Sequence, residues 1–182
     1  SFNAPVDANR AVATRSLPME RVRGVAKAAG ATLNDVAIAL TGAALRRWLE
    51  GRGELSERSL SATCPVSVRS GTGVGNNVSV LIADLATDVD DPLERLQRAR
   101  ASAARGKRQL ASLSQGAAEN WALLLGTAGL ASAIPGLSGR VAPPANLVLS
   151  NVPGPREPRF FGGAELCGYY PVSVVAQGQG LN

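Results

Sequence analysis

Apolar residues recur at helical spacing in three parts of the chain, and the clearest run begins at Thr32. From Leu33 to Trp48 the apolar positions repeat every three or four residues, and Gly51 and Gly53 follow. This pattern predicts a helix whose apolar surface is wide enough to be buried on more than one side. Asp35 stands three residues after Thr32, a spacing that approximates a capping box at the helix start.

Two further helices are predicted, one before and one well after this run. The first is expected between Ser16, as its capping residue, and Gly30, which would end it in the left-handed conformation; Pro18 is tolerated in its first turn. The other begins where several aspartates precede Pro92. Its non-apolar face is dense in arginine, and we interpret that face as mostly solvated.

Strand-like patterns occur on both sides of this third helix. Residues 59–69 alternate between apolar and polar, but Pro65 interrupts the N–H ladder, so this strand is expected at an edge or a bulge there. Residues 77–86 are apolar on both faces, and we expect that strand to lie deeper. A hairpin is predicted around Gly162-Gly163, a last strand over residues 169–176, and a tight bend over residues 177–182 that suggests a missing partner strand.

A short apolar run, Leu147–Leu149, leads into two small polar residues, Ser150 and Asn151, and then into Pro153 and Pro155. A buried strand that ends in hydroxyl and amide groups on a proline-stiffened backbone can hold hydrogen-bond donors in place. A strand end followed by a turn is the alternative. The order of elements predicts an α+β, two-layer fold with a mixed β-sheet and helices packed on it.

Composition excludes several kinds of chemistry. The 182 residues contain no histidine, so a Ser-His-Asp triad, a Cys-His pair, a histidine metal site and a histidine base are absent from this chain. The two cysteines form neither a disulfide framework nor a zinc pattern. The net charge of +5 comes almost entirely from scattered arginines, which could suit phosphate-bearing ligands or reflect residue bias, and which do not indicate nucleic-acid binding.

Four short segments occur in an order that resembles the C-terminal half of a known enzyme family. They are Thr32–Val36, Pro65–Arg69, Gly75–Ser79 and Ser150–Pro155, followed by Tyr170–Ser173 and Gly178–Asn182. Each segment is a weak signal alone, but the ordered set is similar to the bacterial wax ester synthase/acyl-CoA:diacylglycerol acyltransferase family. The resemblance covers nearly the whole chain.

The resemblance implies a chloramphenicol acetyltransferase-like lobe, in a fold with two similar lobes and a tunnel between them. It implies transfer of a fatty acyl group from acyl-CoA, a substrate and not a bound cofactor, to diacylglycerol or a long-chain alcohol. The family's catalytic histidine lies in an HHxxxDG motif of the N-terminal lobe, which this sequence lacks. We therefore expect residues 1–15 to be a connector from a missing N-terminal lobe and residues 16–182 to be the C-terminal lobe, without the family's final strand and helix.

The resemblance also supplies candidate site residues, with no catalytic residue and no metal ligand among them. Asn34 and Asp35 match the family's Asn-Asp motif; Asp35 either caps its helix only or also pairs with the other lobe. Ser150 and Asn151 are candidate tunnel-facing donors. Arg69 could meet a CoA phosphate or a carboxylate at the lobe interface, or be an exposed strand-end residue.

Other functions and locations stay open at this level. A non-catalytic acyl-binding or interface module of the same fold is one alternative, and a related acyltransferase lobe that acts on polyketides or carrier-bound acyl groups is another. The uncharged residues 120–139 predict either a buried helix pair or an apolar lip that touches a lipid surface. With no signal peptide at the start, we expect a cytoplasmic protein, peripheral to membranes or lipid droplets.

Overall fold

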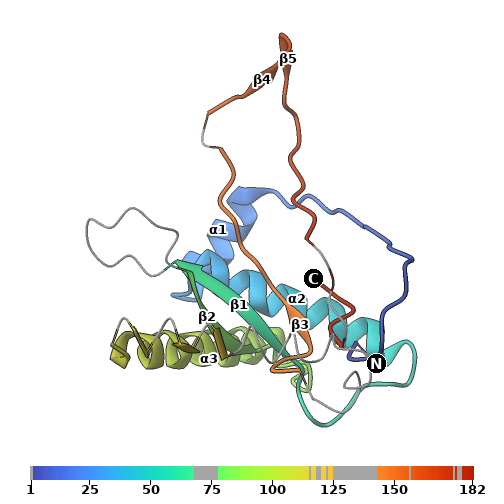
Figure 1. Ribbon diagram of the computed structural model, residues 1–182, viewed down its shortest axis with the longest axis vertical. Helices are drawn as coiled ribbons and strands as arrows, with labels where there is room; N and C mark the ends of the chain where they lie inside the picture. The colour runs from blue at the N-terminus through green and yellow to red at the C-terminus, as the bar shows by residue number, and fades with distance from the viewer. Residues whose placement is uncertain are drawn as a thin grey trace.

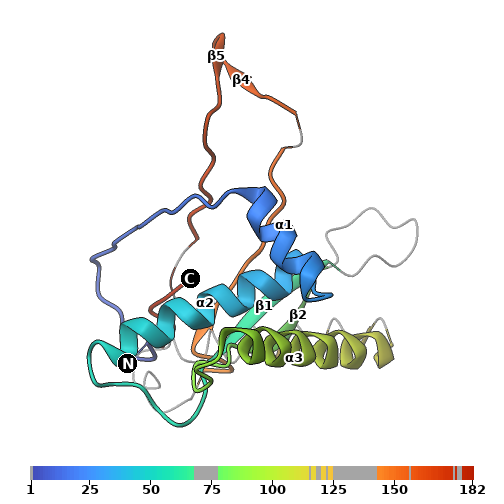
Figure 2. The ribbon, with the colours of Figure 1, turned by 180° about the vertical axis from the view of Figure 1, so that it is seen from behind.

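Among the described residues, helices α1 to α3 and a small mixed sheet form the body of the protein. The computed structural model describes residues 2–67, 78–114, 116–117, 120–121, 123–124, 143–155, 157–173, 175 and 178–182. The elements are α1 (Met19–Ala28), α2 (Leu33–Glu50), β1 (Ser61–Ser67), β2 (Val78–Asp84), α3 (Pro92–Ser112), β3 (Leu147–Val148), β4 (Phe160–Phe161) and β5 (Ala164–Glu165). In the described sheet the order is β2-β1-β3, with β1 antiparallel to β2 and parallel to β3. Figures 1 and 2 show α2 and α3 on the same face of this sheet, which confirms the predicted α+β architecture.

The core lies between that face of the sheet and the two long helices. Ala62 and Cys64 of β1 stand opposite Ala83 and Leu81 of β2, and all four side chains are at most 3% exposed. The alternation in residues 59–69 therefore predicted the buried face of β1 correctly. Small residues let the helices come close, and a Cβ atom on Gly42 of α2 would overlap the carbonyl oxygen of Leu85.

Strand β1 is central at its start and becomes an edge at Pro65. β3 pairs with Ala62 and Thr63, and beyond them β1 is bonded to β2 alone among the described residues, so the missing N–H of Pro65 costs no described ladder bond on the other side. The expected depth of residues 77–86 is confirmed by burial, since residues 79, 81, 83, 85 and 86 are each at most 3% exposed and Pro65 of β1 is exposed, although β2 is the outer strand of the described sheet. Apolar residues on both faces report cover above and below a strand, and they say nothing of its neighbours within the sheet.

The helix starts are set by local side chains, with one exception. The predicted capping box of α2 is present, and Asp91 accepts a hydrogen bond from the Glu94 amide at the start of α3. At α1, however, Pro18 occupies the cap position without a side-chain cap bond, so the prediction that Ser16 caps this helix was wrong. Proline at the boundary restricts the chain to an extended approach and leaves Ser16 too far upstream.

Beyond β3 the chain leaves the body and returns through a hairpin. β4 and β5 pair antiparallel around Gly162 (φ 57°) and Gly163 (φ 85°), the positive angles that a two-residue hairpin turn needs and that glycine tolerates. We refer to residues 150–173 as the arm; every described residue in it is exposed. Figure 1 shows the arm projecting away from the sheet and helices, with the hairpin at its end.

The last strand predicted over residues 169–176 is not formed in its described part, residues 169–173 and 175. Its alternating apolar residues favour an extended backbone, but a strand also needs a neighbour to bond with, and the described chain offers none there.

Most of the uncharged stretch, residues 120–139, lies outside the described residues. Within it, Trp121 donates a hydrogen bond to the carbonyl oxygen of Val80, whereas Leu123 and Leu124 are 64% and 59% exposed. The structure therefore does not test the predicted buried helix pair. None of the described helices is by itself long and apolar enough to cross a membrane. Taken together, α1 and α2 have the length and the apolar composition of a membrane span, but the two helices are bent by 102° at the break between them.

Candidate functional site

Asp35 is buried at the start of α2 and is already engaged by the helix itself. One of its carboxylate oxygens accepts hydrogen bonds from both the amide and the hydroxyl of Thr32, each at 2.8 Å, and the Asp35 amide donates to the Thr32 hydroxyl at 3.2 Å. The side chain is only 4% exposed, while its neighbour Asn34 is half-buried. The capping function of Asp35 is thus confirmed, and a role across a lobe interface stays a prediction.

Ser150 and Asn151 lie at the base of the arm, just after the buried strand β3. Leu147 of that strand is 2% exposed, but both polar residues that follow it are exposed. No hydrogen bond joins them to Asn34, to Asp35 or to any other described side chain. They are presented on the surface of this lobe, and a position facing a tunnel stays a prediction. Arg69, the candidate phosphate-binding residue, lies outside the described residues, as do Gly75–Asn77 of the motif that precedes β2.

A cluster of amide side chains that was not among the candidate site residues joins both ends of the chain. The side chain of Asn146 donates to the Asn3 side-chain oxygen at 2.6 Å, and Asn3 donates to the carbonyl oxygen of Gly178 at 2.7 Å. Buried Gln179 donates to the carbonyl oxygen of Ala145 at 3.1 Å. The side chains of Asn3, Asn146 and Gln179 therefore fix the start of β3 between the two termini.

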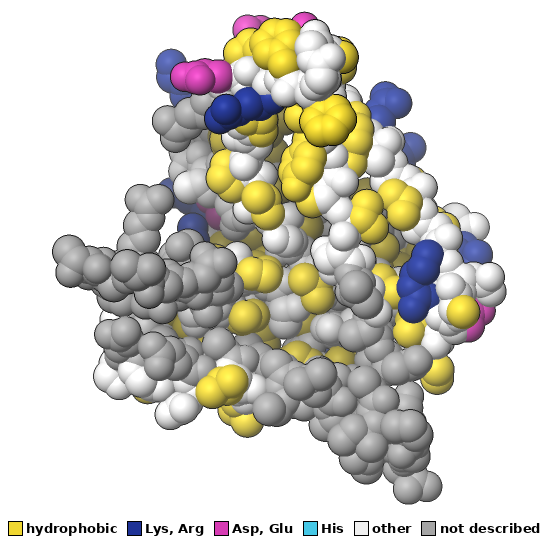
Figure 3. Space-filling view, turned by 45° about the horizontal axis from the view of Figure 1, so that its top comes forward, with side chains coloured by type: hydrophobic (Ala, Val, Ile, Leu, Met, Phe, Trp, Pro, Cys, Tyr) yellow, Lys and Arg dark blue, Asp and Glu magenta, His cyan; other side chains and the backbone are white. Residues whose placement is uncertain are grey.

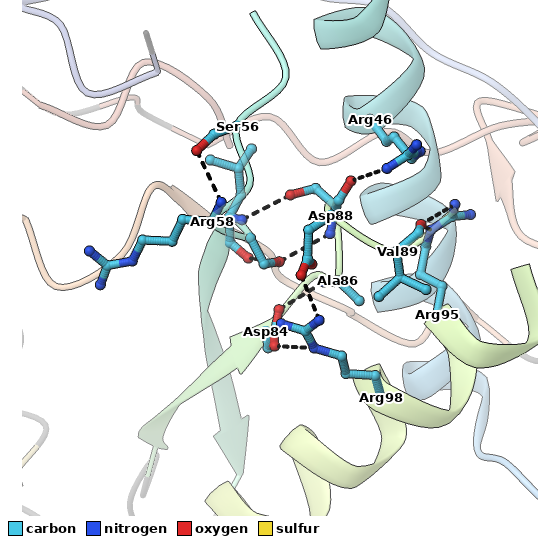
Figure 4. Close-up of polar contacts among 12 residues, drawn as sticks. Arg46, Ser56, Arg58, Asp84, Ala86, Asp88, Val89, Arg95 and Arg98 are labelled. Atoms are coloured by element: carbon cyan, nitrogen blue, oxygen red, sulfur yellow. Dashed lines mark hydrogen bonds and ion pairs between the residues drawn. The ribbon is translucent and has the colours of Figure 1, made fainter. Parts of the chain in front are cut away.

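A second cluster surrounds Arg98 of α3 and was also missed. Figure 4 shows its guanidinium group between two carboxylates, Asp84 at 2.8 Å and Asp88 at 2.7 Å. Sequence reasoning had treated the α3 arginines as a mostly solvated face and Asp88 as part of a helix start. The signal that could have identified the cluster is that the end of β2, at Asp84, and the loop that follows it, at Asp88, both carry a carboxylate shortly before the helix that contains Arg98.

These contacts shift the ionisation of both partners. Burial would raise the pKa of Asp84, but hydrogen bonds from the Ser59 side chain, the Ala86 amide and Arg98 outweigh it and hold the pKa below its usual value. The hydrogen bond to Asp88, opposed by burial and aided by Asp84, raises the pKa of Arg98. Nearby, Arg95 donates to the carbonyl oxygens of Val89 and Asp90. The cluster holds the loop between β2 and α3 to the helix, which is a structural task.

The described residues offer no nucleophile activated by a base. Cys64 is 3% exposed, and its burial raises the pKa of the thiol to about 11, so it is a protonated core side chain. Among the described residues no group of three or more Cys, Asp or Glu side chains could hold a metal ion. With no histidine in the whole sequence, this chain can supply hydrogen-bond donors and walls to a reaction, but no histidine general base.

Two family models match the chain. The WS/DGAT C-terminal domain matches residues 74–182, and the wax ester synthase/diacylglycerol acyltransferase catalytic domain matches residues 1–37. Among the solved structures, the wax ester synthase/diacylglycerol acyltransferase from Marinobacter aquaeolei VT8 aligns with 98% of this chain at a TM-score of 0.83 and 32% identity, through 40% of its own length.

Related sequences point the same way. A Mycobacterium tuberculosis H37Rv protein that bears a provisional diacylglycerol O-acyltransferase name is 41% identical, and the O-acyltransferase WSD of Acinetobacter baylyi is 38% identical. In both cases the match covers all of this chain and 41% of the relative. The chain thus spans about two fifths of the length of these relatives, and it belongs to the wax ester synthase/diacylglycerol acyltransferase family.

Proposed function

We propose that this chain is the C-terminal lobe of an O-acyltransferase that moves a fatty acyl group from acyl-CoA to diacylglycerol or to a long-chain alcohol. The observation that carries the proposal is the structural match over 98% of the chain to a wax ester synthase/diacylglycerol acyltransferase, combined with the absence of histidine from all 182 residues. The general base is then supplied by an N-terminal lobe, as the family resemblance implies.

The chemistry divides naturally between two lobes. When the acceptor hydroxyl attacks the thioester carbonyl, a base must take the hydroxyl proton and fixed donors must stabilise the oxyanion that forms. The thiolate of CoA then leaves and takes up a proton. The part of this chemistry that we assign to the present chain is donation, by the Ser150 hydroxyl and the Asn151 amide, both of which are exposed and therefore free to meet a facing lobe.

The other candidates are proposed as supporting residues. Asn34 and Asp35 stand at the start of α2, where the capping box holds the Asp35 carboxylate at a defined position for pairing with a facing lobe. Arg69 is proposed to meet a phosphate of CoA, because its guanidinium group matches phosphate geometry. Attachment to a membrane or lipid-droplet surface from the cytoplasm is proposed because both acceptor alcohols partition into lipid.

The test is CoA release from a long-chain acyl-CoA with diacylglycerol or a long-chain alcohol as acceptor. The chain is assayed alone and after co-expression with a His-bearing N-terminal lobe taken from the M. tuberculosis relative. We expect no turnover by the chain alone and turnover by the pair. Turnover by the isolated chain would show that the chemistry lies in residues assigned here to support. Acyl-chain binding without turnover by the pair would favour the non-catalytic acyl-binding module.

A double variant then tests the proposed donors. Ser150→Ala with Asn151→Ala should lower kcat of the two-lobe protein by about two to three orders of magnitude, which is the typical cost of losing an oxyanion-hole donor. Because both residues are exposed, the melting temperature should stay unchanged. Unaltered kcat in the double variant would remove these residues from the site.

A further inference from the structure

An open hollow of about 320 Å³ lies between the outer edge of β2 and helix α3. Residues 80–82 of the strand, α3 between residues 102 and 110, and the side chain of Trp121 line it. Because the strand order is β2-β1-β3, this hollow and the strand that leads to Ser150 and Asn151 lie on opposite sides of β1. It is also a different surface from the exposed apolar side chains that Figure 3 shows at the end of the molecule where the hairpin projects. The hollow therefore needs an explanation of its own.

The backbone along the outer edge of β2 faces this hollow. Leu85 donates to the carbonyl oxygen of Leu60, at the position that continues the register of β1 and β2. In an antiparallel pair such bonds recur at every second residue, and the residues between them turn their amide and carbonyl groups away from the neighbouring strand. In β2 these residues are Val80, Ile82 and Asp84. Their backbone groups form the outer edge of the described sheet.

Two side chains occupy part of this edge and leave one residue open. Trp121 donates from its indole N–H to the carbonyl oxygen of Val80 at 3.1 Å, and the amide of Asp84 donates to the Ser102 hydroxyl at 2.9 Å. Between them, no hydrogen bond from another described residue reaches the amide or the carbonyl group of Ile82. The two side-chain contacts block the addition of a further strand, because that requires a row of unpaired backbone groups. What remains is a single amide donor at the wall of the hollow, which suits one polar group of a small ligand.

The hollow also carries a positive charge that no described carboxylate neutralises. Every charged residue of α3 after Glu94 is basic: Arg95, Arg98, Arg100, Arg105, Lys107 and Arg108. Arg98 is paired with Asp84 and Asp88, whereas Arg105, which lines the hollow, forms no ion pair with a described residue. Gln109, one turn further along α3, adds its side-chain amide to the lining. A guanidinium group, a side-chain amide and a backbone N–H around one hollow are donors that suit a carboxylate.

The rest of the lining is apolar and fits a hydrocarbon chain. Leu81 and Leu110 are 2% and 9% exposed, and the ring of Trp121, which lines the hollow with them, is half-buried. A cavity of about 150 Å³ takes up benzene, a six-carbon molecule, so about 320 Å³ has room for roughly twelve carbon atoms. The volume stands at the small end of the range of about 300–1,000 Å³ that small-molecule sites occupy.

We propose that this hollow binds the anion of a fatty acid of roughly twelve carbons, with its carboxylate at Arg105 and its chain against Trp121. The Ile82 amide and the Gln109 side chain complete the donors for the carboxylate. A cationic head group would be repelled by Arg105, and a neutral alcohol would leave its charge unpaired. The proposal does not depend on the proposed transfer, in which the acyl group enters as a thioester and leaves as an ester, so that a free fatty acid is neither substrate nor product.

Binding is measured with 11-bromoundecanoate, because the bromine at the end of its chain quenches the fluorescence of an indole that it contacts. The chain has two tryptophans, Trp121 in the hollow and Trp48, which stacks on Phe2 with ring centroids 5.2 Å apart. We expect saturable quenching of the full chain in the Trp48→Phe variant and no saturable quenching in Trp121→Phe. The titration runs below the concentration at which the acid forms micelles.

The carboxylate site is tested by one substitution with a matched control. Arg105→Gln should weaken binding of the acid by about 10-fold or more, because it removes charge-assisted hydrogen bonds. Arg108→Gln removes the same charge from the same helix outside the hollow and should leave the affinity unchanged. Both arginines are exposed, so both variants should keep the wild-type melting temperature. The neutral alcohol 11-bromoundecanol should bind about 10-fold more weakly than the acid.

Four results would overturn the proposal. Quenching of Trp121 that does not saturate up to about 1 mM acid would mean that the hollow is not a binding site. Quenching that persists in Trp121→Phe would place the acid beside Trp48 instead. Equal affinity for the acid and the alcohol would mean that the carboxylate is not recognised. Equal weakening by Arg105→Gln and Arg108→Gln would mean that the acid responds only to the overall charge of α3.

Discussion

Replacement of Gly42 by alanine should strongly destabilise the lobe, although alanine is the better helix former. Gly42 lies in the middle of α2, where an added Cβ atom would overlap the carbonyl oxygen of Leu85 and stand 3.0 Å from its carbonyl carbon. The obstacle is backbone at the end of β2, so it cannot rotate away, and α2 must move off the sheet.

The magnitude follows from two opposing contributions. Overpacking of a tight core costs typically 1–3 kcal/mol, and contact with backbone places this site near the upper end. The higher helix propensity of alanine relative to glycine offsets about 1 kcal/mol of this loss in the free energy of unfolding. The expected net loss is about 2 kcal/mol, which for a domain of this size lowers the melting temperature by roughly 4–8 °C.

Two other helical glycines provide internal controls. At Gly24 of α1 no atom lies within 4 Å of an added Cβ, so Gly24→Ala should raise the melting temperature by roughly 2–4 °C. At Gly106 of α3 the added atom would stand 3.1 Å from the Leu81 Cβ, and the two contributions should nearly cancel. Melting is followed by far-UV circular dichroism. If Gly42→Ala proves as stable as Gly24→Ala, the close packing of α2 on Leu85 is wrong.

Three further predictions concern a buried thiol, an ion pair and a helix cap. Burial raises the folded-state pKa of Cys64 from 9.0 to about 11, so its contribution to stability is complete below pH 9 and is lost as the pH rises to 11; the stability of wild type relative to Cys64→Ala should fall by about 2 kcal/mol over that range in urea titrations. The pKa of Asp84 is lowered on folding, so its contribution to the free energy of unfolding is present above about pH 4 and is lost in more acidic solution. Asp84→Asn should therefore make the free energy of unfolding depend less on pH below pH 4. Arg98→Met, which removes the partner of Asp84, should lower the free energy of unfolding by about 1–2 kcal/mol at pH 7. Thr32→Ala removes the cap of α2 and should lower the free energy of unfolding by about 1 kcal/mol. Asp35→Asn is compared with Thr32→Ala in the two-lobe protein at equal stability, and if it lowers turnover no more than Thr32→Ala does, Asp35 is a structural residue only.

The predictions that held depend on chemistry within a few residues. The capping box of Thr32 and Asp35, the start of α3 at Asp91-Pro92 and the turn at Gly162-Gly163 each form from neighbours in the chain, so a short window of sequence contains all the interacting groups. The candidate site residues came from the resemblance; the structure places the pair 34–35 at a helix start and the pair 150–151 at the base of the arm, and their role in a site stays a prediction.

Apart from the Ser16 cap, which failed because Pro18 takes the cap position, the features that the sequence did not predict depend on distant partners. Alternating residues 169–176 read as a strand, yet no described neighbour pairs with residues 169–173. Strand β1 is central because residues 147–148, far along the chain, return to its side. Likewise, nothing in the sequence distinguishes Arg98 from the other arginines of α3, and only the fold shows that it lies between Asp84 and Asp88.

Local order along this chain is therefore legible from sequence, because capping, turn geometry and helical periodicity are short-range. Strand order, the ion pairs of α3 and the exposure of the arm follow only from the folded arrangement, because each depends on which remote segment comes to lie alongside. The alternation of Val172 with its neighbours signals a surface to be covered, and only the tertiary structure reveals that no described part of this chain covers it.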